Sequence, residues 1–222
     1  MNMNYLVIDL EMCKVPKNYR SKNYKYAQEI IQVGAVLLDE SFEIIGKLNQ
    51  YVHPEHGVID KFISNLTGIY AGQVKNAPRL QEVLNHMIDW IGDREYKIYA
   101  WSDSDYNQFM HEIVSKEILD TKIDDFMNTE RWIDYQAVFG NRFEFSRAIS
   151  LEEALLYCDI KADGRMHDGL DDAINTSKLI KLLETNDEYT ICHYEKNIQM
   201  NAEPLNFSLG DLFAGLNLGY IA

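Results

Sequence analysis

The chain has 222 residues, of which 46% are hydrophobic and 25% are charged, a composition typical of a soluble globular domain that buries a substantial core. No stretch approaches the roughly 18 consecutive apolar residues of a membrane span, and Asp9 and Glu11 interrupt the first apolar segment, unlike a secretion signal, so we expect a cytoplasmic protein without a membrane partner. The net charge of −14 argues, on composition alone, against a polyanion such as nucleic acid as the substrate.

The predicted elements begin with a strand over residues 4–10, whose apolar run indicates a central position covered on both faces. Further strands are expected at 30–38, 42–52 and 96–101, and helices at 59–66, 78–91, 105–117, 151–157 and 172–184. Pro78 suits the first position of its helix, and Ser150 with Glu153 predicts a capping box for 151–157. This order predicts an α/β domain with a mixed central sheet flanked by helices, over residues 1–185.

The chain beyond residue 185 is less regular, and residues 186–222 are expected to form a C-terminal extension. Its apolar segment, residues 206–218, could dock on the domain or on another chain. The three cysteines, Cys13, Cys158 and Cys192, are an odd number without metal-ligand spacing. We therefore expect free thiols.

A basic segment follows the first strand. Between residues 12 and 28 the chain has no acid and five basic residues, namely Lys14, Lys17, Arg20, Lys22 and Lys25. Three tyrosines are interleaved with them, namely Tyr19, Tyr24 and Tyr26. Positive charge mixed with aromatic rings suits a nucleic-acid single strand, which offers both phosphates and base faces. A solvated surface loop is the competing interpretation.

Asp9 and Glu11 lie at the end of the first predicted strand. Because they are two residues apart, their side chains share one face at a spacing of roughly 6.5–7 Å. Two carboxylates at the edge of a buried sheet repel each other and are poorly hydrated. A divalent cation would relieve both problems, since magnesium prefers carboxylate oxygens. A solvent-facing alternation on an edge strand explains the same pattern without a metal.

Asp105 ends the stretch Trp101-Ser-Asp-Ser-Asp105, which follows directly on an apolar strand and leads into a helix. A carboxylate at this position suits a helix cap and the helix dipole. It would also lie at the carboxyl end of a strand, where open α/β sheets bind their ligands. Asp105 is therefore either a cap or a third carboxylate beside Asp9.

His167 lies between Gly164 and Gly169, which favours a turn ahead of the last predicted helix. The first turn of that helix contains Asp171 and Asp172. An imidazole exposed on a turn can take a proton near neutral pH. A surface turn with helix-capping aspartates is the alternative.

In this order the D-x-E pair, the strand-borne aspartate and the H-x-x-x-x-D stretch resemble the DEDDh exonucleases of the ribonuclease-H-like superfamily, over residues 5–183. Within that family, the sequence is most similar to the branch that contains the histone-mRNA 3′ exonuclease, the RNA-interference-enhancing exonucleases and the bacterial KapD-type proteins. Four stretches carry it: Ile8-Asp-Leu-Glu-Met-Cys13; Leu66-Thr-Gly-Ile69 with Val74 and Ala77-Pro78; Trp101-Ser-Asp-Ser-Asp105; and Gly164-Arg-Met-His-Asp-Gly-Leu-Asp-Asp-Ala173.

The resemblance implies a ribonuclease-H-like arrangement of the mixed central sheet and also the site residues. The metal-binding carboxylates would be Asp9, Glu11, Asp105 and Asp172, and the general base would be His167. It selects Asp105 over Asp103, and Asp172 over Asp171, although helical spacing from the histidine would favour Asp171. Substrate contacts are expected from residues around these positions, namely Met12, Lys17, Arg20, Lys22, Leu66 and Thr67.

The implied activity is a metal-dependent 3′-to-5′ exonuclease that acts on single-stranded nucleic acid, with RNA or short oligonucleotides preferred. Two Mg²⁺ ions, for which Mn²⁺ could substitute, would support a two-metal hydrolysis that releases nucleoside 5′-monophosphates. Their charge would offset the acidic composition at the place where the phosphate binds. Two alternative functions are a regulatory binding protein on an exonuclease fold and a DNA repair or proofreading exonuclease subunit.

Overall fold

The structure is a computed structural model that describes residues 3–20 and 24–192. The strands are β1 (Asn4–Lys14), β2 (Gln28–Leu38), β3 (Ile44–Tyr51), β4 (Tyr96–Ala100) and β5 (Trp132–Asp134). The α-helices are α1 (Lys61–Thr67), α2 (Ala71–Val74), α3 (Leu80–Ile91), α4 (Asp103–Ser115), α5 (Thr121–Phe126), α6 (Tyr135–Arg142), α7 (Leu151–Tyr157) and α8 (Gly169–Glu184). Two short 3-10 helices are η1 (Lys17–Tyr19) and η2 (Thr129–Arg131).

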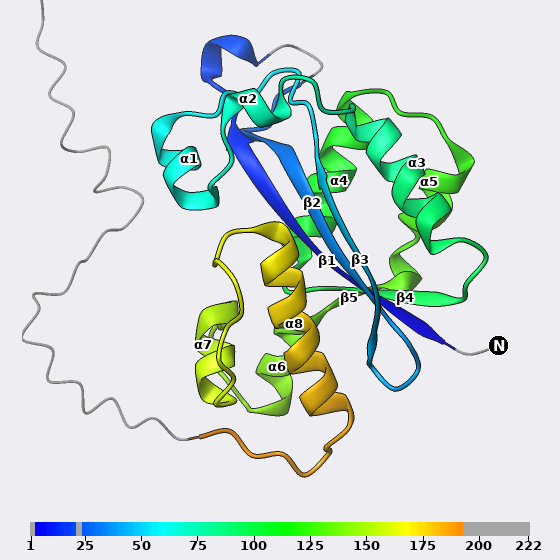
Figure 1. Cartoon of the computed structure of the whole chain (residues 1–222), viewed down its shortest axis with the longest axis vertical. Coiled ribbons are helices and arrows are strands. Elements are labelled where there is room, and N and C mark those ends of the chain that lie inside the picture. The colour runs from blue at the N-terminus through cyan, green and yellow to red at the C-terminus, as the bar shows by residue number, and fades with distance from the viewer. Residues whose placement is uncertain (1–2, 21–23, 193–222) are drawn as a thin grey trace, which may run out of the picture. The chain divides into compact units, whose positions relative to one another are not determined.

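The strands form one sheet in the order β3-β2-β1-β4-β5. β2 pairs antiparallel with both β1 and β3, whereas β4 pairs in parallel with both β1 and β5. Figure 1 shows α3, α4 and α5 on one side of the sheet and α6, α7 and α8 on the other. The predicted mixed central sheet flanked by helices is confirmed, with β1 at its centre.

The two faces of β1 belong to separate hydrophobic cores. Leu6 and Ile8 pack in a core that includes Phe109 of α4. Val7 packs in a second core, which includes Leu179 of α8. Because successive side chains alternate between the faces of a strand, Asp9 follows Val7 on the face toward α8. The polar end of that face is where the candidate site lies.

Helix α3 begins later than predicted. Arg79 is its N-cap, and the backbone N–H of Arg79 donates to Oε2 of Glu82 at 2.9 Å. Pro78 therefore precedes the cap instead of occupying the first helical position. The carboxylate of Glu82 fixes the start of the helix because it satisfies a backbone donor that has no partner within the helix.

Helices α4 and α8 begin earlier than predicted. Ser102 caps α4 by accepting the N–H of Ser104, so Asp105 lies inside the first turn and is not the cap. Asp168 caps α8 by accepting the N–H groups of Leu170 and Asp171. In both cases the capping side chain stands three or four residues ahead of the acid that the sequence pattern placed at the helix start.

Helix α7 agrees with prediction, since Ser150 caps it and Glu153 completes the capping box. Helices α2, α5 and α6 and strand β5 were not predicted. Strand β5 has three residues and α2 has four, which is too short for a periodic signal. Asp120 before α5 and Asp134 before α6 each accept a backbone N–H as N-caps, so capping chemistry was the available signal.

The chain continues past α8 along the same unit to Cys192. The hydroxyl of Tyr189 donates to the carbonyl of Cys158 at 2.8 Å, and the N–H of Cys192 donates to the carbonyl of Tyr157 at 2.8 Å. The three cysteines are free thiols. The apolar segment 206–218 lies outside the described residues, so its docking and the boundary at residue 185 stay predictions. No helix in the described ranges is long and apolar enough to cross a membrane.

The start of α8 lies directly against β2. A Cβ atom added to Gly34 of β2 would lie 2.0 Å from the carbonyl carbon of Gly169. A Cβ added to Gly169 would lie 3.0 Å from the carbonyl oxygen of Asp9. The N–H of Gly169 also donates to Oε1 of Gln32 at 3.0 Å. Glycine at positions 34 and 169 thus allows the backbones to approach closely, which brings the turn before α8 to Asp9 of β1.

We expect Gly34→Ala to destabilise the fold by more than the roughly 1–3 kcal/mol of ordinary overpacking, because the added methyl group would meet backbone atoms that cannot rotate away. Urea unfolding would measure the loss. Gly140→Ala in α6 is the matched control, since a Cβ there meets nothing described within 4 Å outside its own helix. The control should be neutral or stabilising by up to about 1 kcal/mol. Equal stability of the two variants would show that the close approach is not required.

Candidate active site

Strand β1 carries the first two acids of the site. Asp9 is half-buried and Glu11 is buried, and both lie on the face toward α8. Just beyond Glu11 the ladder with β2 shifts, because Glu11 pairs with Gln32 whereas Met12 pairs with Ile30. β2 therefore holds one extra residue, Ile31, opposite the acid. A bulge of this kind bends a strand and re-aims the neighbouring side chains.

A buried ionic network on the other side of the bulge was not anticipated from the sequence. Oε1 of Glu112 accepts the N–H of Ile30 at 2.6 Å. Nζ of Lys116 lies 2.8 Å from carboxylate oxygens of both Glu112 and Glu29, and Glu29 in turn accepts the N–H of Glu55 at 2.7 Å. Glu112 and Lys116 are an i, i+4 pair, which from sequence alone indicates an exposed helix face. In the structure they fix α4 to the bulge.

Asp105 turns from α4 toward the sheet. The last residue pair between β1 and β4 is Ile8 with Ala100. Beyond it, Oδ1 of Asp105 accepts the N–H of Leu10 at 3.1 Å. Asp105 thus takes the place of a strand partner beside Leu10 in the second half of β1, whereas Asp103 is exposed.

The turn before α8 presents His167 in a left-handed conformation, with φ of 63°, which is uncommon for a residue other than glycine. Two acids of α8 hold this turn. Oδ2 of Asp172 accepts the N–H of His167 at 2.8 Å, and Oδ2 of Asp171 accepts the N–H of Arg165 at 2.8 Å. Asp171 is therefore engaged with the turn, while the His167 side chain stays exposed.

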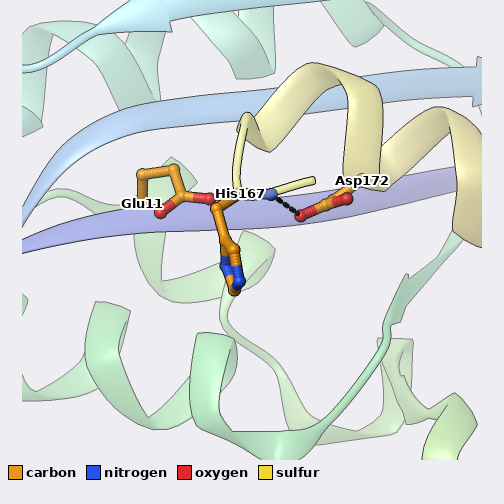
Figure 2. A group of neighbouring side chains, drawn as sticks. All are labelled: Glu11, His167 and Asp172. Carbon is orange, nitrogen blue, oxygen red and sulfur yellow. Dashed lines mark hydrogen bonds between the residues drawn. The ribbon is translucent and has the colours of Figure 1, made fainter. Parts of the chain in front are cut away.

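Glu11, His167 and Asp172 come together although they are far apart in the sequence. Their potential ligand atoms all lie within 4.8 Å of one another. Figure 2 shows His167 between the two carboxylates, with its backbone nitrogen bonded to Asp172 and its ring extending beyond them. The packing of α8 on β1 and β2 produces this arrangement.

The carboxylates disfavour one another's charge. Burial raises the pKa of Glu11 to about 8, helped by the negative charges of Asp172, Asp168 and Asp105. Burial also raises the pKa of Asp105 to about 7 and that of Asp172 to about 6. The pKa of Asp9 is raised well above its usual value by burial and then by Asp105, Asp172 and Glu11. The mutual effects place all four carboxylates in one electrostatic cluster.

The cluster fits a divalent cation. Oδ1 of Asp172 is buried and has no hydrogen-bond partner among the described residues. A buried oxygen without a donor is costly, and a cation would satisfy it. The donor set consists of carboxylate oxygens, which suit magnesium or manganese, with one imidazole beside them. His167 is placed so that it could act either as a ligand or as a base.

The two substrate-contact residues expected in α1, Leu66 and Thr67, differ in how far their side chains are exposed. Leu66 is half-buried, whereas Thr67 is 2% exposed and its hydroxyl donates to the carbonyl of Ile63. A contact from Thr67 would therefore have to come from its main chain.

The guanidinium of Arg165 donates to the carbonyls of Asn65 and Leu66. These two bonds link the end of α1 to the turn that holds His167.

The basic segment is partly folded into the domain. Met12 is half-buried in β1, Lys17 is exposed on η1, and Nε of Arg20 donates to the carbonyl of Val15 at 3.2 Å. Lys22 lies outside the described residues. Tyr24 is fully buried, so its ring is not available to a substrate. The interpretation of this segment as an entirely solvated loop is therefore wrong for Tyr24.

Comparison with known proteins places these features in a family. A model described as exonuclease (RNase_T) matches residues 6–180. The 3′-5′ exoribonuclease 1 of Rattus norvegicus is 29% identical over 175 residues, which cover 75% of this chain and 50% of that protein. The ERI1 exoribonuclease 2 of Xenopus laevis is 34% identical over 176 residues, which cover 68% of this chain and 25% of that protein. The chain thus spans half or less of the length of these curated relatives.

Solved structures show the same fold. A full-length 3′-exonuclease has a TM-score of 0.69 at 25% identity, covering 85% of this chain and 62% of that one. The nuclease domain of 3′hExo, a DEDDh family member bound to rAMP, has a TM-score of 0.69 at 24% identity, covering 85% and 96%. The predicted resemblance to this family is confirmed.

The raised carboxyl pKa values predict how stability depends on pH and metal. A carboxyl group whose pKa is raised in the folded state favours folding while protonated, and this contribution is lost as pH rises through the folded-state value. In chelator, we therefore expect Tm to fall between about pH 5 and pH 8. Added Mg²⁺ or Mn²⁺ should raise Tm more at the upper end of this range, since a cation binds the ionised carboxylates.

Glu11→Gln tests the assignment through stability alone. At about pH 8 in chelator the variant should be more stable than the unmodified protein by on the order of 2 kcal/mol, and its Tm should respond less to metal. Glu40→Gln, at an exposed turn position, is the control and should change neither quantity. A Glu11→Gln variant with unaltered pH and metal responses would contradict the proposed cluster.

Proposed function

The chain belongs to the exonuclease family whose model matches residues 6–180, and on that premise we propose that it is a metal-dependent 3′-to-5′ exonuclease. Its substrate would be single-stranded nucleic acid, with RNA or short oligonucleotides preferred, and its products nucleoside 5′-monophosphates. The convergence of Glu11, His167 and Asp172 within 4.8 Å, with Asp9 and Asp105 in the same electrostatic cluster, carries this proposal.

The residues that would hold the metal are the four carboxylates, namely Asp9, Glu11, Asp105 and Asp172. Two Mg²⁺ ions, or Mn²⁺ in their place, would supply charge for the attacking and leaving oxygens of the phosphodiester. The protein's part is to hold the carboxylate oxygens that would bind the metal in position before the substrate binds. Asp105 is held by the N–H of Leu10, and Asp172 by the N–H of His167.

His167 would act as the general base that takes a proton from the attacking water. An imidazole is the side chain best suited to accept a proton at neutral pH. Its exposure gives it access to solvent, and the bond from its own N–H to Asp172 fixes the turn that carries it. The left-handed backbone, with φ of 63°, is the kind of strain that surrounding structure maintains at functional sites.

The net charge of −14 does not exclude this substrate. A pair of divalent cations adds about four positive charges where the phosphate would bind. Positive charge along the nucleic-acid strand would come from Lys17, Arg20 and Lys22. The terminal nucleotide would be contacted by Met12 and Leu66. The relatives that match over most of the chain are named exoribonucleases, which favours RNA.

The set of acids and the histidine favours an enzyme over a regulatory binding protein on the same fold. A DNA repair or proofreading subunit has weaker support. The DNA polymerase III PolC-type of Staphylococcus haemolyticus is 32% identical over 89 residues, which are 40% of this chain and 6% of that protein. Cytoplasmic location and docking through residues 206–218 stay predictions.

The direct test is degradation of single-stranded RNA and DNA labelled at either end, with magnesium, manganese or chelator. We expect metal-dependent shortening from the 3′ end, and no measurable turnover in Asp9→Asn with the fold intact by circular dichroism. Asp93→Asn, at an exposed position, should retain full activity. The proposal fails if neither polymer is shortened in the presence of metal.

His167→Ala separates the roles of base and ligand. A base contributes roughly 10²- to 10⁴-fold to the rate, so kcat should fall by that factor while the affinity for Mn²⁺, measured by calorimetry, stays unchanged. The control His86→Ala, at an exposed position of α3, should leave both values as they are. Loss of Mn²⁺ affinity in His167→Ala would instead identify the imidazole as a ligand.

A further inference from the structure

The side chain of Arg165 bridges two parts of the chain that are far apart in the sequence. Its Nη2 donates to the carbonyl of Asn65 and, at 3.0 Å, to the carbonyl of Leu66. Figure 1 shows α1, which contains both carbonyls, next to the start of α8. Arg165 itself is exposed, so this bridge stands outside the hydrophobic cores.

The two carbonyls need these donors because α1 ends at a turn. In a continuing helix they would accept the N–H groups of Ile69 and Tyr70, four residues farther on. The N–H of Ile69 instead donates to Oγ1 of Thr67 at 3.0 Å. The N–H of Tyr70 donates to Oε1 of Gln73 at 2.7 Å. Arg165 therefore completes the end of α1, where the helix dipole also favours a cation.

Gly68 makes room for the guanidinium. It follows α1 with φ of 76°, a left-handed conformation that glycine adopts readily at the end of a helix. A Cβ atom added there would lie 2.1 Å from Nη1 of Arg165. The guanidinium thus lies directly against the backbone of residue 68, in a place that a side chain would fill.

The main chain of Arg165 begins the turn that carries His167. Its carbonyl accepts the N–H of Asp168 at 3.2 Å, which closes a four-residue turn with His167 in third place. A positive φ, such as the 63° of His167, suits that place in a type II turn. The N–H of Arg165 donates to Oδ2 of Asp171 at 2.8 Å. Arg165 therefore holds the histidine turn with its main chain and α1 with its side chain.

The bridge closes a ring around Glu11 of β1. On one side of Glu11, the start of α8 reaches β1 at Asp9, whose carbonyl oxygen lies 3.0 Å from the Cβ position of Gly169. On the other side, α1 and Cys13 of β1 belong to a third hydrophobic core. Arg165 connects α8 to α1 between these two contacts. Burial raises the pKa of Glu11, and the charge of Arg165 partly opposes that rise, which agrees with a guanidinium near this carboxylate.

We infer that Arg165 is a positioning residue, which fixes His167 relative to the end of α1 and thereby relative to a nucleotide that docks there. The inference rests on the proposed function, in which Leu66 contacts the terminal nucleotide and His167 takes a proton from the attacking water. The docking surface and the base are then held by the two ends of one arginine. Arg165 acts through His167 and is not itself a catalytic residue.

Arg165→Met tests the bridge, because it keeps most of the stem and removes every donor. On labelled single-stranded RNA with Mg²⁺, kcat should fall roughly 10- to 100-fold, since small misplacements of a reacting group have costs of this order. We expect KM and the affinity for Mn²⁺ to stay within about threefold, because the carboxylates and the docking surface keep their own supports.

Arg94→Met is the matched control. Arg94 is also exposed, and it also donates to a carbonyl at the end of a helix, that of Ile91 in α3. It precedes β4, whose first residue pairs with Asn4 at the start of β1. The control removes the same groups at the opposite end of β1 from Glu11 and should leave kcat unchanged.

A double variant separates positioning from general support of the fold. Once His167→Ala has removed the base, Arg165 has nothing left to position. Adding Arg165→Met to His167→Ala should therefore lower the single-turnover rate by less than about threefold. Losses that multiply would overturn the inference, because Arg165 would then act independently of the histidine.

Arg165→Lys separates the bridge from the charge. Lysine keeps the positive charge but has a shorter reach and lacks the planar fork of donors. We expect kcat to stay reduced by roughly tenfold, and this variant tests the bridge even if Arg165→Met does not fold. Full kcat in Arg165→Lys would overturn the inference, because the charge alone would then be sufficient.

The outcomes separate the two proposals. An unmodified protein that shortens no nucleic acid contradicts the proposed function, and the positioning role falls with it. A protein that shortens RNA and keeps its kcat in Arg165→Met contradicts the positioning role alone. A raised KM with a weaker salt dependence and an unchanged kcat also overturns it, because this result would identify the guanidinium as a contact for a substrate phosphate.

Discussion

The close approach of α8 to β1 and β2 is the constraint on which the site depends. No side chain fits between Gly34 and Gly169, so the helix begins against the sheet with only backbone in the contact. This places the turn of His167 beside Asp9 and Glu11 of β1 and brings Asp172 to Glu11. A helix held one side-chain thickness farther out would leave the acids of β1 and α8 in separate environments, and each would then be an ordinary surface carboxylate.

The resulting proximity opposes folding in the absence of a cation. Glu11, Asp105 and Asp172 all have raised pKa values, which means that the fold keeps carboxylates together against their preference for water. Other contacts must compensate for this cost. The two cores on either face of β1 and the bonded network of Glu112 and Lys116 lie directly against the site. This site thus resembles other functional sites, in which the surrounding structure compensates for local destabilisation.

Sequence reasoning identified the sheet and β1 from the apolar run of residues 4–10, and the family from the residues around His167. It missed β5 and α2 because three or four residues give no periodic signal. It also began the helix at Asp105 and left a cap as one of two interpretations of that residue, since the pattern does not show that Ser102 takes that role. The i, i+4 spacing of Glu112 and Lys116 is typical of an exposed helix face, and their burial follows only from the packing of α4 on β2. Contacts between residues distant in sequence, such as Gly34 with Gly169, have no local signature.

The carboxylate of Asp172 serves two partners at once, because Oδ2 accepts the N–H of His167 while Oδ1 is buried without a partner. An amide in its place would have to keep its oxygen toward that N–H, and its NH₂ group would then occupy the side where a cation belongs. The neutral isostere would therefore do more than remove a charge, since it would direct two hydrogens at the metal position. The orientation of one side chain makes the geometry of the histidine turn and the occupancy of the cation site interdependent.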